Sequence, residues 1–255
     1  MNAPQAKAVG VIPARWASTR FPGKILAPLC GKPLVQWVVE RAAQARLLEA
    51  VIVATDDARI QDAVAGWGGT VKMTRADHPS GTDRVAEAAA GRDEDIVVNI
   101  QGDEPMIDPA LLDQLIEALV AEPEWDMATA AAPIHSPDEL NAPSVVKVVT
   151  DGHGRALYFS RSVIPHVRDK EAGGSAGAPL HWRHIGVYAY RTTYLQKLVK
   201  TPPCALEEAE KLEQLRALHL GCRMKVIPTG EVGMGVDTPE DLAKAEELMK
   251  EAGWA

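Results

Sequence analysis

The first side chains that could bind a ligand or take part in catalysis are three basic residues that follow an apolar run. Residues 8–13 read AVGVIP, which is typical of a buried strand, and the following loop carries Arg15, Arg20 and Lys24. Gly23 lets the backbone approach an anion closely, and the charged groups can hold phosphate. The loop matches neither the Walker A pattern nor the dinucleotide fingerprint. We expect a phosphate-binding loop, and the alternative is an ordinary solvated loop between a strand and a helix.

A second polar loop, TRADHPSGTDR, follows the apolar run at residues 70–74. It places Arg75, Ser80, Gly81 and Thr82 after a predicted strand. The SGT sequence suits the first turn of a helix, where free backbone N–H groups attract anions. A plain helix cap without any ligand would explain the same residues.

Acidic residues occur at two places where a metal ion could be held. VVNIQGDEP delivers Gln101, Asp103 and Glu104 directly from an apolar strand, and GVDTPEDL supplies Asp237 much later. Carboxylates beside a phosphate-binding loop can hold a hard cation such as Mg²⁺. Each site also has an ordinary explanation, since an Asp after a strand is often a cap and the Thr-Pro after Asp237 begins a good helix.

Strands that alternate with helices must bring these loops together. The first part of the chain has β-rich runs separated by helical patterns, at 8–13, 50–55, 70–74 and 95–100 for strands and at 34–48 and 58–68 for helices. This alternation predicts an α/β protein with a mostly parallel sheet and helices on both faces. Ligands of such sheets bind beyond the carboxyl ends of the strands, which is where the polar loops begin.

The second part of the chain has a less regular pattern. We expect strands at 127–134, 144–150, 155–161, 184–191 and 225–228, and helices at 206–221 and 238–253. Residues 171–181 are expected to form a mobile loop, because their Gly, Ala and Ser content gives little to pack.

Composition is that of an ordinary globular protein. Of the 255 residues, 46% are hydrophobic and 24% are charged. No apolar run approaches the roughly 20 residues that span a bilayer, and the N-terminus lacks the apolar core of a signal peptide. Three scattered cysteines do not suggest a disulfide framework. We therefore expect a soluble, cytoplasmic protein that binds no membrane, and the net charge of −8 disfavours nucleic acid as a partner.

Eight segments resemble, in order and spacing, the 3-deoxy-D-manno-octulosonate (Kdo) cytidylyltransferases, or CMP-Kdo synthetases. They are IPARWASTRFPGK, TRADHPSGTDR, NIQGDEPMI, VKVV, ALYFSR, HIGVYAYR, LEEAEKLEQLR and GVDTPEDL. The resemblance implies a three-layer, nucleotide-diphospho-sugar transferase-like fold with a mostly parallel central sheet, in a single domain over residues 1–255. About 8–125 would bind nucleotide, and about 126–255 would bind sugar, form a homodimer and supply the second metal ligand.

The resemblance also implies an activity and a set of site residues. The family transfers CMP from CTP to Kdo, with Mg²⁺ as cofactor, and so activates Kdo for lipopolysaccharide assembly. The residues matching its triphosphate site are Arg15, Ser18 and Lys24. Those matching the surroundings of the cytidine are Arg75, Ser80 and Gly81. Asp103 and Asp237 match the magnesium pair, and Arg15 and Lys24 complete the expected catalytic set. The residues matching its sugar site are Gln101, which also meets the nucleotide, and His184, Tyr188, Glu213 and Gln214.

The residue pattern agrees with a polar wall for a sugar acid. In HIGVYAY the strand period of two sends His184, Gly186 and Tyr188 to one face. Arg161 could meet a sugar carboxylate with two hydrogen bonds, although a surface salt bridge explains it nearly as well. Glu213 could instead pair with Arg216 at helical spacing.

Attack of the Kdo 2-hydroxyl on the α-phosphorus of CTP would expel pyrophosphate, and positive groups would stabilise the charge that develops. Segments 168–182 and 202–210 vary from the family pattern, which leaves substrate preference open. The alternatives are an 8-amino-Kdo or sialic acid cytidylyltransferase, or a catalytically silent nucleotide sensor.

Overall fold

A nine-stranded mixed sheet forms the centre of the protein in a computed structural model, which describes residues 6–17, 20–168, 179–230 and 233–254. The main path runs β11-β7-β10-β6-β1-β4-β5. These strands span Met224–Pro228, Met127–Pro133, Trp182–Arg191, Ile96–Asn99, Ala8–Ala14, Leu48–Thr55 and Val71–Met73. Two further strands, β8 (Lys147–Thr150) and β9 (Ala156–Ser160), extend from β10.

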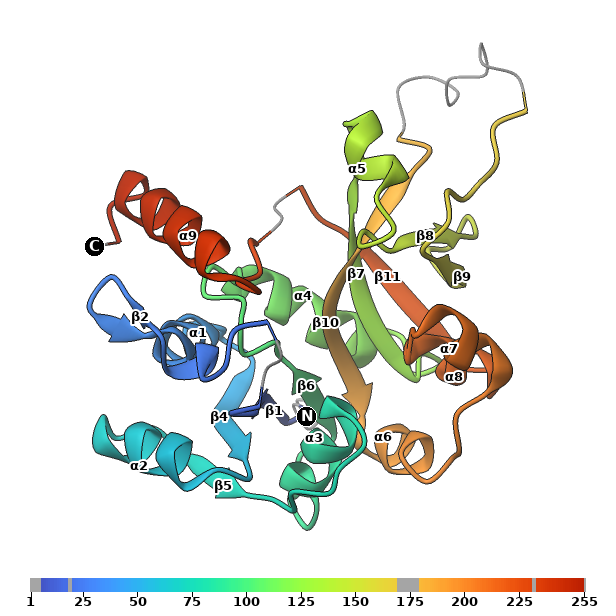
Figure 1. Cartoon of the computed structure of the whole chain (residues 1–255). Helices are drawn as coiled ribbons and strands as arrows, with labels where there is room; N and C mark the ends of the chain where they lie inside the picture. The colour runs from blue at the N-terminus through green and yellow to red at the C-terminus, as the bar shows by residue number, and fades with distance from the viewer. Residues whose placement is uncertain (1–5, 18–19, 169–178, 231–232, 255) are drawn as a thin grey trace.

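Most neighbouring strands of the main path are parallel. β1 pairs with β4 and β6 in parallel, as do β4 with β5 and β11 with β7, whereas β10 is antiparallel to both of its neighbours, β6 and β7. The prediction of a mostly parallel sheet is therefore confirmed. Strands from the first and second parts of the chain hydrogen-bond to one another within this sheet (Figure 1).

Helices cover both faces of the sheet, as the alternating pattern predicts. One hydrophobic cluster contains residues of α1 (Leu34–Ala42), α2 (Ala58–Gly66), α4 (Pro109–Ala121) and α9 (Pro239–Glu251). The other contains residues of α3 (Gly81–Ala89), α6 (Thr192–Leu198) and α8 (Gln214–His219). β1 divides its side chains between them, with Ile12 in the first cluster and Val11 in the second, because alternate residues of a strand point to opposite faces.

The smaller elements are peripheral. A two-stranded ribbon joins β2 (Pro28–Leu29) to β3 (Lys32–Pro33), and a short helix η1 (Lys24–Leu26) precedes it. α5 (Pro137–Asn141) and α7 (Ala205–Glu210) are brief helices. The C-terminal helix α9 lies beside β2, so a late segment of the sequence packs against the ribbon that follows the opening loop (Figure 1). Within the described ranges, no helix has both the length and the apolar character needed to cross a bilayer.

Two predicted helices were wrong in their extent. The helix expected at 34–48 ends at Ala42, because Leu48 already pairs with Ala8 in the sheet. The helix expected at 206–221 is broken into α7 and α8 at Lys211, whose φ of 53° is left-handed. The Arg161 side chain donates to the carbonyls of Glu210 and Lys211, which stabilises this break. Of the loop expected at 171–181, residues 171–178 lie outside the described residues.

Candidate active site

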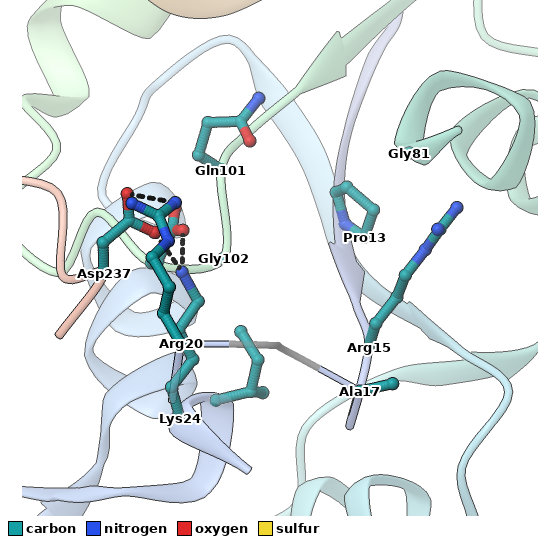
Figure 2. A pocket seen from close by; sticks show the side chains of 11 residues that line it. Pro13, Arg15, Ala17, Arg20, Lys24, Gly81, Gln101, Gly102 and Asp237 are labelled. Carbon is teal, nitrogen blue, oxygen red and sulfur yellow. Dashed lines mark hydrogen bonds and ion pairs between the residues drawn. The ribbon is translucent and has the colours of Figure 1, made fainter. Parts of the chain in front are cut away.

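The loops beyond the carboxyl ends of β1 and β6 surround a polar cavity of about 430 Å³. It is lined by Pro13, Arg15, Ala17, Arg20, Lys24, Ile25, Gly81, Gln101, Gly102, Asp103 and Asp237. We call it the cationic cavity, because three of these side chains are basic. Figure 2 shows Arg20 and Lys24 approaching Asp237 on one side, while Arg15 and Gly81 lie on the other. Four loops that are distant in the sequence thus contribute to one hollow.

Lys24 holds the two predicted metal ligands together. Its Nζ lies 2.5 Å from Asp103 Oδ2 and 2.9 Å from Asp237 Oδ1, and it donates to the carbonyl of Val236 at 3.1 Å. All three N–H groups of the ammonium therefore have an acceptor. Burial lowers the pKa of Lys24, but the charge of Asp103 and the hydrogen bonds to Asp103 and Asp237 outweigh it, so this pKa lies above its usual value. The lysine is a fixed positive charge in the floor of the cavity.

Two arginines add positive charge at the rim. Arg20 forms an ion pair with Asp237 at 2.9 Å and keeps 64% of its side chain exposed. Arg15 donates from Nη2 to the carbonyl of His78 at 3.2 Å. Among the residues that the structure describes, the guanidinium of Arg15 binds one carbonyl, and that of Arg20 is exposed, so both groups can turn to an entering anion.

Small residues keep the cavity open to a ligand. A Cβ at Gly102 would lie 3.1 Å from Ile25 Cδ1 and 3.3 Å from the carbonyl of Pro13, so a side chain here would crowd the wall. Gly81 begins α3, and the hydroxyl of Ser80 caps that helix by accepting from the N–H of Asp83. The cap predicted from SGT is confirmed, and the positive end of α3 faces the cationic cavity.

A second cavity of about 460 Å³ adjoins the first. Its lining includes Pro13, Gly81, Gln101, Asp103 and Asp237, all of which also line the cationic cavity. The two cavities are therefore parts of one cleft that meet at these shared residues. The remaining lining residues are Thr82, Asn99, Glu104, Val146, His184, Gly186, Tyr188, Leu212, Glu213, Gln214 and Gly235. We call this part the hydroxyl-side cavity: no lysine or arginine is among its described lining residues, and uncharged hydrogen-bonding groups line it beside the carboxyl groups of Asp103, Glu104, Glu213 and Asp237.

One wall of the hydroxyl-side cavity is β10. His184, Gly186 and Tyr188 all line it, so the predicted shared face of this strand is confirmed. His184 Nε2 lies 3.0 Å from the hydroxyl of Thr129, and its ring meets Phe159 edge-on. Burial lowers the pKa of His184 to about 3, so the imidazole is neutral near pH 7. The strand presents neutral donors and acceptors to the cleft.

The other wall comes from the start of α8. Glu213 accepts hydrogen bonds from Ser80 and Thr82, each at 2.9 Å, and pairs with Arg216 at 2.8 Å. The predicted pair with Arg216 is confirmed, yet the glutamate also lines the cavity beside the buried Gln214. Gln101 donates to the carbonyl of Gly186 at 2.8 Å and so links the loop after β6 to β10. Hydrogen bonds between side chains of the first part of the sequence and residues of the second part therefore hold the cleft together.

The cytidylyltransferase family model matches residues 9–225. A 3-deoxy-manno-octulosonate cytidylyltransferase from Geobacter sulfurreducens is 52% identical over 245 residues, which cover 94% of this chain and 98% of the relative. A second enzyme of that name, from Syntrophobacter fumaroxidans, is 53% identical over 92% of this chain and 93% of its own.

The chain belongs to the family of 3-deoxy-manno-octulosonate cytidylyltransferases.

Solved structures of cytidylyltransferases agree with this assignment. A CMP:2-keto-3-deoxy-manno-octonic acid synthetase complexed with CTP superposes with a TM-score of 0.91 at 44% identity, covering 97% of this chain and 100% of that one. A 4-diphosphocytidyl-2C-methyl-D-erythritol synthase from Anaerococcus prevotii, at 12% identity, has a TM-score of 0.65 over 96% of this chain and 99% of that one. The second likeness shows the shared nucleotidyltransferase-type fold alone.

Three described residues that were predicted for the cytidylyltransferase site are not among the side chains lining the cleft: Arg75, Ser80 and Arg161, although Ser80 donates to Glu213, which does line it. Arg75 lies in a separate surface hollow and contacts Asp77 and Glu87. The guanidinium of Arg161 binds backbone carbonyls, including those at the break after α7, and it forms no salt bridge with any residue that the structure describes. Ser18 lies outside the described residues. Their roles toward nucleotide and sugar stay predictions.

Asn99 was missed as a site residue of this cytidylyltransferase, although it lines the hydroxyl-side cavity. Thr82, named in the second polar loop, lines the same cavity, and Arg20, named among the cations that could hold phosphate, reaches Asp237. Asn99 could have been found from the strand period, because it stands two residues before Gln101 and so shares its face. Glu104 also lines this cavity, and burial together with the charge of Asp103 raises its pKa to about 7.

Asp103 and Asp237 are the residues of this cytidylyltransferase that could hold a metal ion. Both contact one nitrogen, that of Lys24, so their carboxylates lie close enough to share a cation. The described part of the chain contains no cluster of three or more His, Cys, Asp or Glu side chains suited to a metal ion. A cation bound by this pair would need further ligands from substrate or water, which is the usual arrangement for Mg²⁺.

Proposed function

We propose that the protein transfers CMP from CTP to Kdo and releases pyrophosphate, which activates Kdo for lipopolysaccharide assembly. The observation that carries the proposal is the divided cleft: a cationic cavity and a hydroxyl-side cavity share Gln101, Asp103 and Asp237. A triphosphate suits the first cavity and a polyhydroxylated sugar acid suits the second. The near full-length similarity to Kdo cytidylyltransferases and to a synthetase complexed with CTP supports the same substrates.

The reaction takes place, in this proposal, where the two cavities meet. The 2-hydroxyl oxygen of Kdo forms a bond to the α-phosphorus of CTP, the bond from that phosphorus to the bridging oxygen breaks, and pyrophosphate leaves. The hydroxyl proton is released to solvent or to a carboxylate. Lys24 and Arg15 counter the charge that develops on the phosphate oxygens, and the N–H groups at the start of α3 supplement them.

Mg²⁺ is the proposed cofactor, and Asp103 with Asp237 would hold it. Their carboxylates fit a hard cation because they already share one positive group, the Lys24 ammonium. When bound, the ion would supply charge neutralisation at the phosphates. Lys24 holds the two carboxylates together at the cleft before substrate enters, and Arg20 adds a second ion pair to Asp237.

The hydroxyl-side cavity is proposed to select the sugar acid. His184 and Tyr188 form one wall and Glu213 and Gln214 the other, so several sugar hydroxyls can be bonded at once. A neutral His184 suits this role, because it can donate and accept without attracting a second phosphate. We also propose the homodimer and the cytoplasmic location that the family resemblance implies.

A pyrophosphate-release assay tests the function. CTP with Mg²⁺ should give pyrophosphate with Kdo, and less or none with 8-amino-Kdo and sialic acid. ATP in place of CTP, and CTP without sugar, are the controls. Turnover with sialic acid alone would reassign the substrate. Calorimetric binding of CTP without turnover on any of the three sugars would favour the silent nucleotide sensor.

A further inference from the structure

Asn99, the last residue of β6, lines the hydroxyl-side cavity and carries a polar group that is unpaired among the described residues. The residue is 3% exposed and lines that cavity, yet its Oδ1 has no hydrogen-bond partner within the described ranges. Burying an amide oxygen without a donor opposes folding, and such groups are rare in native proteins. A leucine of similar size would avoid this cost, so the amide requires an explanation other than stability.

The neighbours of Asn99 in the cavity make the contrast clear. Gln101 binds the carbonyl of Gly186, His184 lies beside the Thr129 hydroxyl, and Glu213 accepts from Ser80 and Thr82. Each of these polar groups has a partner within the protein. The Asn99 oxygen lies among these groups but has no hydrogen-bond partner in the described part of the protein. An oxygen in that state can accept a hydrogen bond from a ligand.

The position of Asn99 shows which ligand it would meet. It is paired with Tyr188 across the β6–β10 register and, like Gln101 two residues later, contributes to the hydroxyl-side cavity. It lines the hydroxyl-side cavity and is absent from the lining of the cationic cavity. A molecule reacting where the cavities meet, beside Gln101 and Asp103, would place its far portion over Asn99.

We propose that the Asn99 carboxamide is a specificity-determining group that hydrogen-bonds one hydroxyl of the sugar acid, an inference that rests on the proposed function. A hydroxyl both donates and accepts, and a carboxamide offers an acceptor oxygen and a donor nitrogen, so the two match. A site built to bond a hydroxyl discriminates strongly against a substrate that lacks it, because its own buried group is then left unpaired.

The first test is Asn99→Leu, which keeps the side-chain size and removes hydrogen bonding. We expect kcat/KM for Kdo to fall about tenfold, while KM for CTP changes by less than about twofold. The melting temperature should stay the same or rise, because the substitution removes an unpaired buried group. Asn141→Leu is the matched control: Asn141 lies in α5, lines neither cavity, and should leave both KM values unchanged.

A second test uses Kdo analogues, and its first measurement is on the wild-type enzyme, so that measurement does not depend on the variant folding. Among Kdo analogues that each lack one hydroxyl, wild type should turn over one with a kcat/KM about tenfold below its value for Kdo. For Asn99→Leu, kcat/KM with that analogue should equal kcat/KM with Kdo, because the hydrogen bond is already lost. An unchanged kcat/KM for Kdo in folded Asn99→Leu would overturn the inference. The inference would also be overturned if Asn99→Leu melted at a lower temperature than wild type and lost kcat/KM equally for CTP and Kdo, because that result indicates a structural role. Absence of wild-type turnover with CTP and Kdo would instead refute the proposed function.

Discussion

Replacing Lys24 with Met tests whether the ammonium holds the two acidic loops together. The substitution preserves the length of the side chain and removes its charge. Lys24 is 11% exposed, whereas its partners Asp103 and Asp237 are 28% and 45% exposed. Removing one member of a fully buried pair costs roughly 3–5 kcal/mol, and partial exposure of the carboxylates together with the remaining Arg20 reduces this. We expect the free energy of unfolding to fall by about 2 kcal/mol.

Urea unfolding of the apo protein measures this change, and the melting temperature should fall by about 4–8 °C. Lys250→Met is the matched control, because Lys250 forms an exposed ion pair with Glu246 within α9 and should cost under about 0.5 kcal/mol. A double-mutant cycle with Asp103→Asn should give a coupling of at least about 1 kcal/mol. A cycle that is additive, with a Lys24→Met cost no larger than that of the control, would refute the shared-lysine reasoning.

Three further predictions concern the metal pair and the sugar walls. Asp103→Asn and Asp237→Asn should each lose at least roughly a hundredfold in turnover, about 2.7 kcal/mol of barrier, while remaining folded; near-normal turnover at saturating Mg²⁺, CTP and Kdo would exclude that aspartate from the site. His184 has a pKa of about 3 when folded and roughly 6.5 when unfolded, so the unfolded chain binds the extra proton and stability falls as pH drops below about 6.5. Between about pH 7.5 and 5.5, wild type should lose about 1.4 kcal/mol of unfolding free energy more than His184→Gln, and equal losses would contradict the buried neutral imidazole. Glu213→Gln should raise KM for Kdo about tenfold and KM for CTP only about twofold, through its bonds to Ser80 and Thr82; a larger effect on CTP in steady-state kinetics would place Glu213 in the wrong part of the cleft.

Much of the fold was predictable from local sequence patterns. Alternating strands and helices predicted the mostly parallel sheet, because period-two and period-3.6 burial are readable from apolar residues alone. The SGT cap and the shared face of His184 and Tyr188 were predictable for the same reason: each depends on residues within a few positions of one another. The break at Lys211 was not, since Arg161, fifty positions away, binds the carbonyls that the break leaves free.

The sequence by itself determined which loops carry the chemistry, and by resemblance it identified the family. What only the tertiary structure decided is how those loops face one another. Lys24 and Asp237 are 213 positions apart, and no local pattern predicts that a lysine expected to bind phosphate rests between two aspartates expected to bind a metal. Likewise, the sequence shows Asn99 only as a polar residue in an apolar strand. That its oxygen is buried without a partner among the described residues becomes visible once β10 is packed beside β6. Such contacts depend on the free energy of the whole packed core. That packing brings segments that are far apart in the sequence into contact, and the local sequence of either segment does not predict the contact.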